Sequence, residues 1–166
     1  LAMLLRVLAE SMGTAQAGWA QLLLVFGLLS VFLGNFVAIA QFNLKRMLAY
    51  STIAHMGFIL LGAMTGTTDG YSAALFYTIT YAMMAAGGFA ILILLGREGF
   101  EAETLDDLKG LNERNPWYAF VMMVFLFSMA GIPPTVGFYA KLSIIQAVMQ
   151  AGYLWPAVFM VVMSVI

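Results

Sequence analysis

From Pro116 to Ile166 the sequence is apolar almost throughout, and it carries one formally charged side chain, Lys141. An isolated ammonium at the centre of a bilayer helix costs about 2.5–3.5 kcal/mol on insertion scales. A chain tolerates that cost only if the lysine faces protein or water and has a partner. Lys141 therefore constrains the fold, because the helices around it must enclose a polar space.

The composition excludes several other classes of protein. Hydrophobic residues make up 63% of the chain and charged residues only 9%, whereas a soluble domain carries about 25% charged residues. Seven basic against eight acidic residues leave no basic patch for nucleic acid. Without cysteine, and with one histidine, the chain offers no ligand set for an iron–sulfur cluster, a haem or a zinc ion. We therefore expect an integral membrane protein with no metal and no redox cofactor of its own.

The apolar runs divide the chain into membrane spans, since a helix needs about 20 residues to cross the hydrocarbon. This predicts an all-α, polytopic transmembrane helix bundle, a single domain over residues 1–166. Both ends lie inside apolar runs, without a start methionine or a signal peptide, so we expect a fragment of a longer protein. The predicted spans are about 1–10 (the tail of a span), 19–41, 47–64, 71–95, 116–150 (broken) and 155–166 (truncated).

The span at 116–150 is interrupted by helix breakers, namely Gly131, Pro133, Pro134 and Gly137. As one helix it would measure about 52 Å at 1.5 Å per residue, too long for a straight crossing. One interrupted span with an offset half and two short re-entrant halves both fit the sequence. Broken helices at membrane depth occur where they are buried in protein or line a water-filled cavity.

The basic residues of the connections alternate from side to side. The segments 42–46 and 97–115 hold Lys45, Arg46, Arg97, Lys109 and Arg114, while 11–18, 65–70 and 151–154 hold no lysine or arginine. By the positive-inside rule the first set is cytoplasmic. Within 97–115, Asp106 and Asp107 indicate a solvated loop face.

Lys141 and His55 are the main candidates for moving a proton. Ionisable residues inside a membrane are rare and often mark proton relays, and a histidine titrates near neutrality. The competing interpretations are a lysine that snorkels to the interface and a histidine that only packs.

Other polar residues are less specific. Ser51 and Thr52 lie on the helix face of His55. Tyr77 and Tyr81 form a stripe that suits either a polar path or contacts between helices. Lys45 is either a site residue or a positive-inside anchor beside Arg46.

Two long motifs resemble a known family. Asn43-Leu-Lys-Arg-Met-Leu-Ala-Tyr-Ser-Thr-Ile-Ala-His-Met-Gly57 and Gly131-Ile-Pro-Pro-Thr-Val-Gly-Phe-Tyr-Ala-Lys141 are similar to the antiporter-like membrane subunits of respiratory complex I. The resemblance covers essentially the whole chain. Together with Leu105-Asp-Asp-Leu-Lys-Gly-Leu111 and Asn115-Pro-Trp117, the Ser-Thr-Ile-Ala-His-Met-Gly form is most similar to the branch whose mitochondrial counterpart is subunit 2.

The resemblance implies a fold and a function. The chain would be the second of two inverted repeats, with 116–150 as its discontinuous helix. It would belong to a proton-translocating subunit of NADH:quinone oxidoreductase in the bacterial inner membrane, among other membrane subunits of that complex. NADH, FMN, iron–sulfur clusters and quinone would be bound by other subunits. Lys141 would be the exit-side lysine, His55 a relay, and Lys45 the lysine of the Asn-x-Lys-Arg motif. Tyr139-Ala140 departs from the bulky residue and glycine expected before that lysine.

Two further interpretations remain open. A cation/proton antiporter of the Mrp type would share the same core. A structural membrane module would not need Lys141 or His55, and removing a buried charge can even stabilise a protein.

Overall fold

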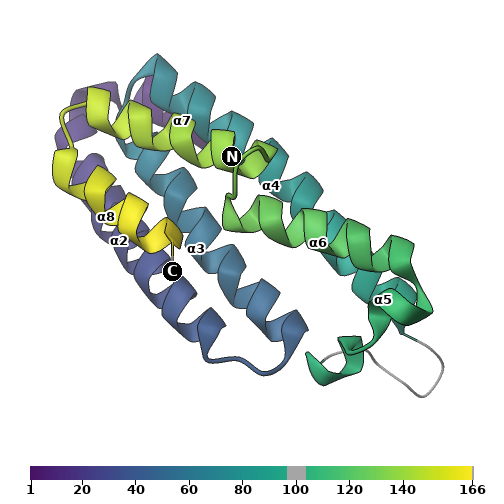
Figure 1. Cartoon of the computed structure of the whole chain (residues 1–166). Coiled ribbons are helices and arrows are strands. Elements are labelled where there is room, and N and C mark those ends of the chain that lie inside the picture. The colour runs from purple at the N-terminus through teal and green to yellow at the C-terminus, as the bar shows by residue number, and fades with distance from the viewer. Residues whose placement is uncertain (97–103, 166) are drawn as a thin grey trace.

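The computed structural model describes residues 1–96 and 104–165, which form helices and turns; its one β-type pairing within these ranges is an isolated bridge (Figure 1). The predicted all-α class is confirmed. In chain order the elements are α1 (Ala2–Arg6), the π-helical turn η1 (Val7–Ser11), the 3-10 turn η2 (Gly13–Ala15), α2 (Gln16–Ile39), α3 (Leu44–Met64), α4 (Thr68–Leu95), the 3-10 turn η3 (Asp106–Leu108), α5 (Leu111–Arg114), α6 (Pro116–Ala130), α7 (Val136–Gln150) and α8 (Leu154–Val165).

In the part of the chain that the structure describes, three helices are long and apolar enough to cross a membrane, namely α2, α3 and α4. Each begins three residues before the span predicted from hydropathy, and in α3 and α4 a polar side chain caps the helix outside the apolar run. The Asn43 side chain accepts the Arg46 N–H at the start of α3, and Thr67 accepts the Gly70 N–H at the start of α4. Such caps satisfy amide donors that have no partner within the helix.

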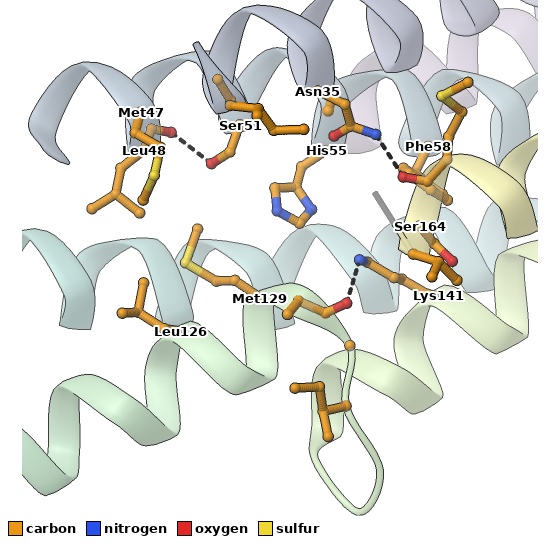
Figure 2. A pocket seen from close by; sticks show the side chains of 18 of the residues that line it. Asn35, Met47, Leu48, Ser51, His55, Phe58, Leu126, Met129, Lys141 and Ser164 are labelled. Carbon is orange, nitrogen blue, oxygen red and sulfur yellow. Dashed lines mark hydrogen bonds between the residues drawn. The ribbon is translucent and has the colours of Figure 1, made fainter. Parts of the chain in front are cut away.

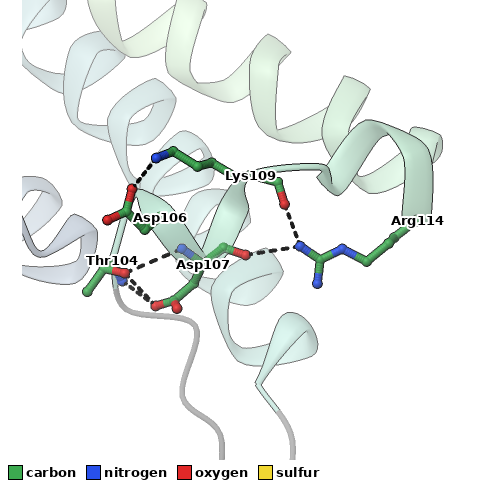
Figure 3. A network of polar contacts seen from close by, with 5 residues as sticks. All are labelled: Thr104, Asp106, Asp107, Lys109 and Arg114. Carbon is green, nitrogen blue, oxygen red and sulfur yellow. Dashed lines mark hydrogen bonds and ion pairs between the residues drawn. The ribbon is translucent and has the colours of Figure 1, made fainter.

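The structure adds detail to two predicted segments. The tail predicted at 1–10 is the α-helix α1 followed by the π-helical turn η1. The described part of the connection 97–115 folds into η3 and α5, while residues 97–103 lie outside the described residues. Figure 3 shows why this loop is ordered: the Asp107 carboxylate accepts the Thr104 N–H (2.8 Å) and hydroxyl (2.7 Å), and Arg114 donates to two loop carbonyls.

Helices α2 and α3 pack closely where α2 carries a stripe of small residues at helical spacing, which includes Gly27 and Gly34. A Cβ atom on Gly34 would lie 2.4 Å from the Ala54 nitrogen, and one on Gly27 would lie 2.8 Å from Leu61. The glycines thus let the two backbones approach. The stripe serves helix packing.

The two halves of the broken span, α6 and α7, both lie along α4. In Figure 1, α6 and α7 follow each other in the same general direction, opposite to α4. The second half of α4 lies against α6, where Gly87 faces the Phe125 ring, and its first half lies against α7, where the rings of Phe76 and Tyr139 are 5.9 Å apart. At 15 residues each, α6 and α7 are about 22 Å long. Each half alone is therefore shorter than a hydrocarbon core of about 30 Å.

The two basic connections lie at the same end of the bundle. Asn43, before α3, forms an antiparallel β-bridge with Thr104, after α4. This pairing agrees with the side-to-side alternation of charge predicted from the sequence.

Candidate functional site

A cavity of about 560 Å³ opens between α2, α3, α6, α7 and α8 (Figure 2). Its walls are mostly apolar, with side chains such as Phe58, Leu126 and Met129. The polar side chains that reach it come from four helices: Asn35, Ser51, His55, Lys141 and Ser164. Lys141 and His55, which lie far apart in the sequence, therefore line the same cavity.

Lys141 is held at the break in the discontinuous helix. Its Nζ donates to the Ala130 carbonyl at 2.9 Å, and it lies 5.7 Å from the centroid of the Phe58 ring. Ala130 is the last residue of α6, where carbonyls lack partners within the helix and carry partial negative charge. The carbonyl and the ring together stabilise the ammonium inside the bundle.

The Gly131 conformation allows this contact. Gly131 follows α6 with a φ of +81°, the left-handed region that glycine adopts without strain. A Cβ atom there would lie 3.0 Å from Lys141 Cδ. Of the predicted breakers, Gly131 and Pro133 line the cavity. Pro134 forms a cis peptide bond with Pro133, and Gly137 lies in the first turn of α7.

His55 is buried within α3 and is fixed from α4. Its Nδ1 lies 2.7 Å from the Tyr77 hydroxyl, and its ring stacks on Tyr81 with centroids 4.4 Å apart. Tyr77 is 1% exposed, so the hydroxyl–imidazole contact is shielded from lipid and water. With Nδ1 engaged, the other ring nitrogen is the one available to other partners.

The remaining predicted polar residues divide into two groups. Ser51 lines the cavity, whereas Thr52, its neighbour, accepts the Tyr81 hydroxyl at 2.6 Å between α3 and α4. Both hydroxyls also donate to the Leu48 carbonyl. Tyr77 and Tyr81 thus act as contacts between helices that hold His55.

Lys45 is not part of this cavity. It lies half-buried in the first turn of α3, ten residues before His55, or about 15 Å along the helix. The structure therefore brings together Lys141, His55 and Ser51, with Lys45 nearer the end of the bundle where α3 begins.

Sequence reasoning missed Asn35 and Ser128. The Asn35 amide donates to the Met163 carbonyl at 2.7 Å, which links α2 to α8 beside the cavity. Ser128 is buried in α6 and accepts the Gly137 N–H at 3.2 Å. Asn35 could have been found from the sequence, because an amide side chain in the middle of an apolar span is unusual. Serines are common in membrane helices, so nothing in the sequence distinguished Ser128.

Within residues 1–96 and 104–165, no group of three or more histidine, aspartate or glutamate side chains could hold a metal ion. The site instead presents an amine and an imidazole on one cavity. Both groups can bind and release a proton, and water in the cavity could carry it between them.

A discontinuous helix beside an internal cavity with ionisable side chains is characteristic of membrane transport domains. The whole chain, residues 1–166, matches the family described as NADH:quinone oxidoreductase/Mrp antiporter, transmembrane. The chain belongs to this family.

Among curated relatives, the chain is 57% identical over 166 residues to NADH-quinone oxidoreductase subunit N of Thioalkalivibrio sulfidiphilus. It is 53% identical over 165 residues to subunit N of Thiobacillus denitrificans. These matches cover 100% and 99% of the chain but 35% and 34% of the relatives, so the chain spans about a third of their length. These relatives are named subunit N, which confirms the branch of the family that the sequence motifs favoured.

Two solved structures share the fold. The Mrp complex from a Dietzia strain matches with a TM-score of 0.88 at 28% identity, covering 99% of this chain and 30% of that one. Respiratory complex I from Thermus thermophilus with bound aureothin matches with a TM-score of 0.75 at 32% identity, covering 87% and 32%. Similar folds thus occur in both kinds of complex.

Proposed function

We propose that this chain is part of a proton-translocating subunit of NADH:quinone oxidoreductase, and that Lys141 and His55 lie on its proton path. The observation that carries the proposal is the cavity they share, with Lys141 at the helix break and His55 fixed by Tyr77. Relatives at 52–57% identity carry the name of subunit N.

In this proposal quinone reduction takes place in other subunits, which also bind NADH, FMN and the iron–sulfur clusters. The subunit lies in the bacterial inner membrane among other membrane subunits. Its part in the reaction is to bind and release protons at Lys141 and His55 while the cavity is hydrated. Lys45, at the cytoplasmic end of α3, lies on the side from which protons would enter.

The test is Lys141→Ala in the intact complex, with protons translocated measured against quinone reduced. We expect fewer protons per quinone at normal assembly. Lys109→Ala is a matched control, because Lys109 is a lysine on the exposed loop face. Equal ratios in the two variants would remove Lys141 from the path and would favour the structural-module interpretation.

The second candidate is a cation/proton antiporter of the Mrp type, which the fold match to the Mrp complex favours. It predicts proton exchange that depends on sodium or potassium in the full-length protein reconstituted without the other subunits. Exchange that is absent there, with pumping present in the intact complex, would exclude this candidate.

A further inference from the structure

The break between α6 and α7 leaves two sets of backbone groups without partners in their own helix. These are the last carbonyls of α6 and the first amides of α7. Thr135, at the N-cap of α7, accepts no N–H of that helix; its hydroxyl donates to the Ile132 carbonyl at 2.6 Å. Within a membrane such groups must find partners in the protein.

Each half of the span supplies a side chain to the other half. Ser128 of α6 accepts the N–H of Gly137 in the first turn of α7, at 3.2 Å. Lys141 of α7 donates to the Ala130 carbonyl at the end of α6, at 2.9 Å. The caps are therefore reciprocal.

The two contacts are mechanically linked. Gly137 and Lys141 are four residues apart, so they lie on the same face of α7, one turn from each other. A Cβ atom on Gly137 would lie 1.8 Å from the Ser128 carbonyl oxygen, so the two backbones touch at this point. Moving α7 away from Ser128 would also move Lys141 away from Ala130.

We propose that Ser128 is a positioning residue for Lys141. By accepting the Gly137 N–H, it sets the register of α7 against the end of α6 and so places the ammonium at the Ala130 carbonyl, on the wall of the cavity. This inference rests on the proposed role of Lys141 in proton translocation. It predicts that a change at Ser128 lowers proton translocation only when Lys141 is present.

The experiment uses the full-length protein in the intact complex, with protons translocated per quinone reduced as the readout. Ser128→Ala removes the acceptor, and Ser128→Cys replaces it with a weak one of similar size. Ser128→Thr keeps the hydroxyl. Ser143→Ala is the matched control, because Ser143 lies on α7 and its hydroxyl bonds to the Ala140 carbonyl of its own helix. The double variant Ser128→Ala/Lys141→Ala tests whether the effect passes through Lys141.

We expect Ser128→Ala and Ser128→Cys to lower the ratio toward that of Lys141→Ala, and Ser128→Thr to restore it. The double variant should match Lys141→Ala, because residues in one network are not additive. If Ser128→Ala does not assemble, Ser128→Cys decides.

A ratio in the assembled Ser128 variant equal to that of Ser143→Ala would overturn the inference. The inference would also be overturned if adding Ser128→Ala to Lys141→Ala lowered the proton-to-quinone ratio by as much as Ser128→Ala lowers it alone. Both outcomes leave the role of Lys141 intact, whereas a normal ratio in Lys141→Ala overturns both proposals.

Discussion

The Lys141 ammonium and the Ala130 carbonyl meet at 2.9 Å across the break in the discontinuous helix. The ammonium is thus bound at the end of α6, on the wall of the cavity. The contact accounts for a charged side chain in an otherwise uncharged stretch, since the helix end offers both an acceptor and partial negative charge.

Gly131→Ala should displace Lys141. The new Cβ would lie 3.0 Å from Lys141 Cδ, and alanine at a φ of +81° costs about 1–2 kcal/mol. We expect a lower thermal stability and fewer protons per quinone. Gly152→Ala is the control, because Gly152 has a φ of +87° and nothing within 4 Å. Equal proton-to-quinone ratios in the two variants would show that Lys141 does not depend on Gly131.

Tyr77→Phe should release the His55 ring from its fixed orientation. The change removes the hydroxyl 2.7 Å from His55 Nδ1 and keeps the aromatic ring. Contacts of this kind between membrane helices contribute about 0.6 kcal/mol on average, so we expect a small loss of stability and a clear loss of pumping. Tyr139→Phe is the control, since Tyr139 is 63% exposed. Wild-type pumping by Tyr77→Phe would assign the hydroxyl to packing alone.

Gly34→Ala should separate α2 from α3. Its Cβ would lie 2.4 Å from the Ala54 backbone nitrogen, which cannot move without shifting α3. Overpacking of this kind costs about 1–3 kcal/mol, measurable as a lower unfolding temperature of the assembled complex. Gly88→Ala has one neighbour, Leu48, at 4.0 Å and should be tolerated. Similar unfolding temperatures for the two variants would contradict the close contact.

The ion pair on the loop between α4 and α6 should be insensitive to pH near neutrality. The hydrogen bond and charge of Asp106 raise the pKa of Lys109 above its ordinary value. Because the pKa of Lys109 is raised, any stabilisation of the folded state by the ion pair is complete below the ordinary lysine pKa of about 10.4. It is lost only at higher pH. Thermal melts of Asp106→Asn and wild type should therefore differ by the same amount at about pH 7 and about pH 9. A difference that changes over this range would contradict the assignment.

The sequence was sufficient to locate the long helices and the break. Apolar runs set the spans, and Gly131 with the two prolines set the position of the break, because both signals are local. The sequence could not separate Ser51 from Thr52, which are neighbours on α3 but face the cavity and α4 respectively. Nor could it pair Ser128 with Gly137 or Asn35 with Met163, because those contacts depend on how the helices pack.

Locating ordered water in the cavity of the intact complex, at a resolution that shows individual molecules, tests the account most directly. A cavity of about 560 Å³ has room for roughly ten or more water molecules. We predict a chain of ordered waters from Lys141 Nζ toward the His55 ring, with Ser51, Asn35 or Ser164 among their partners. A lipid chain or apolar side chains filling this space would contradict a proton path between the two residues.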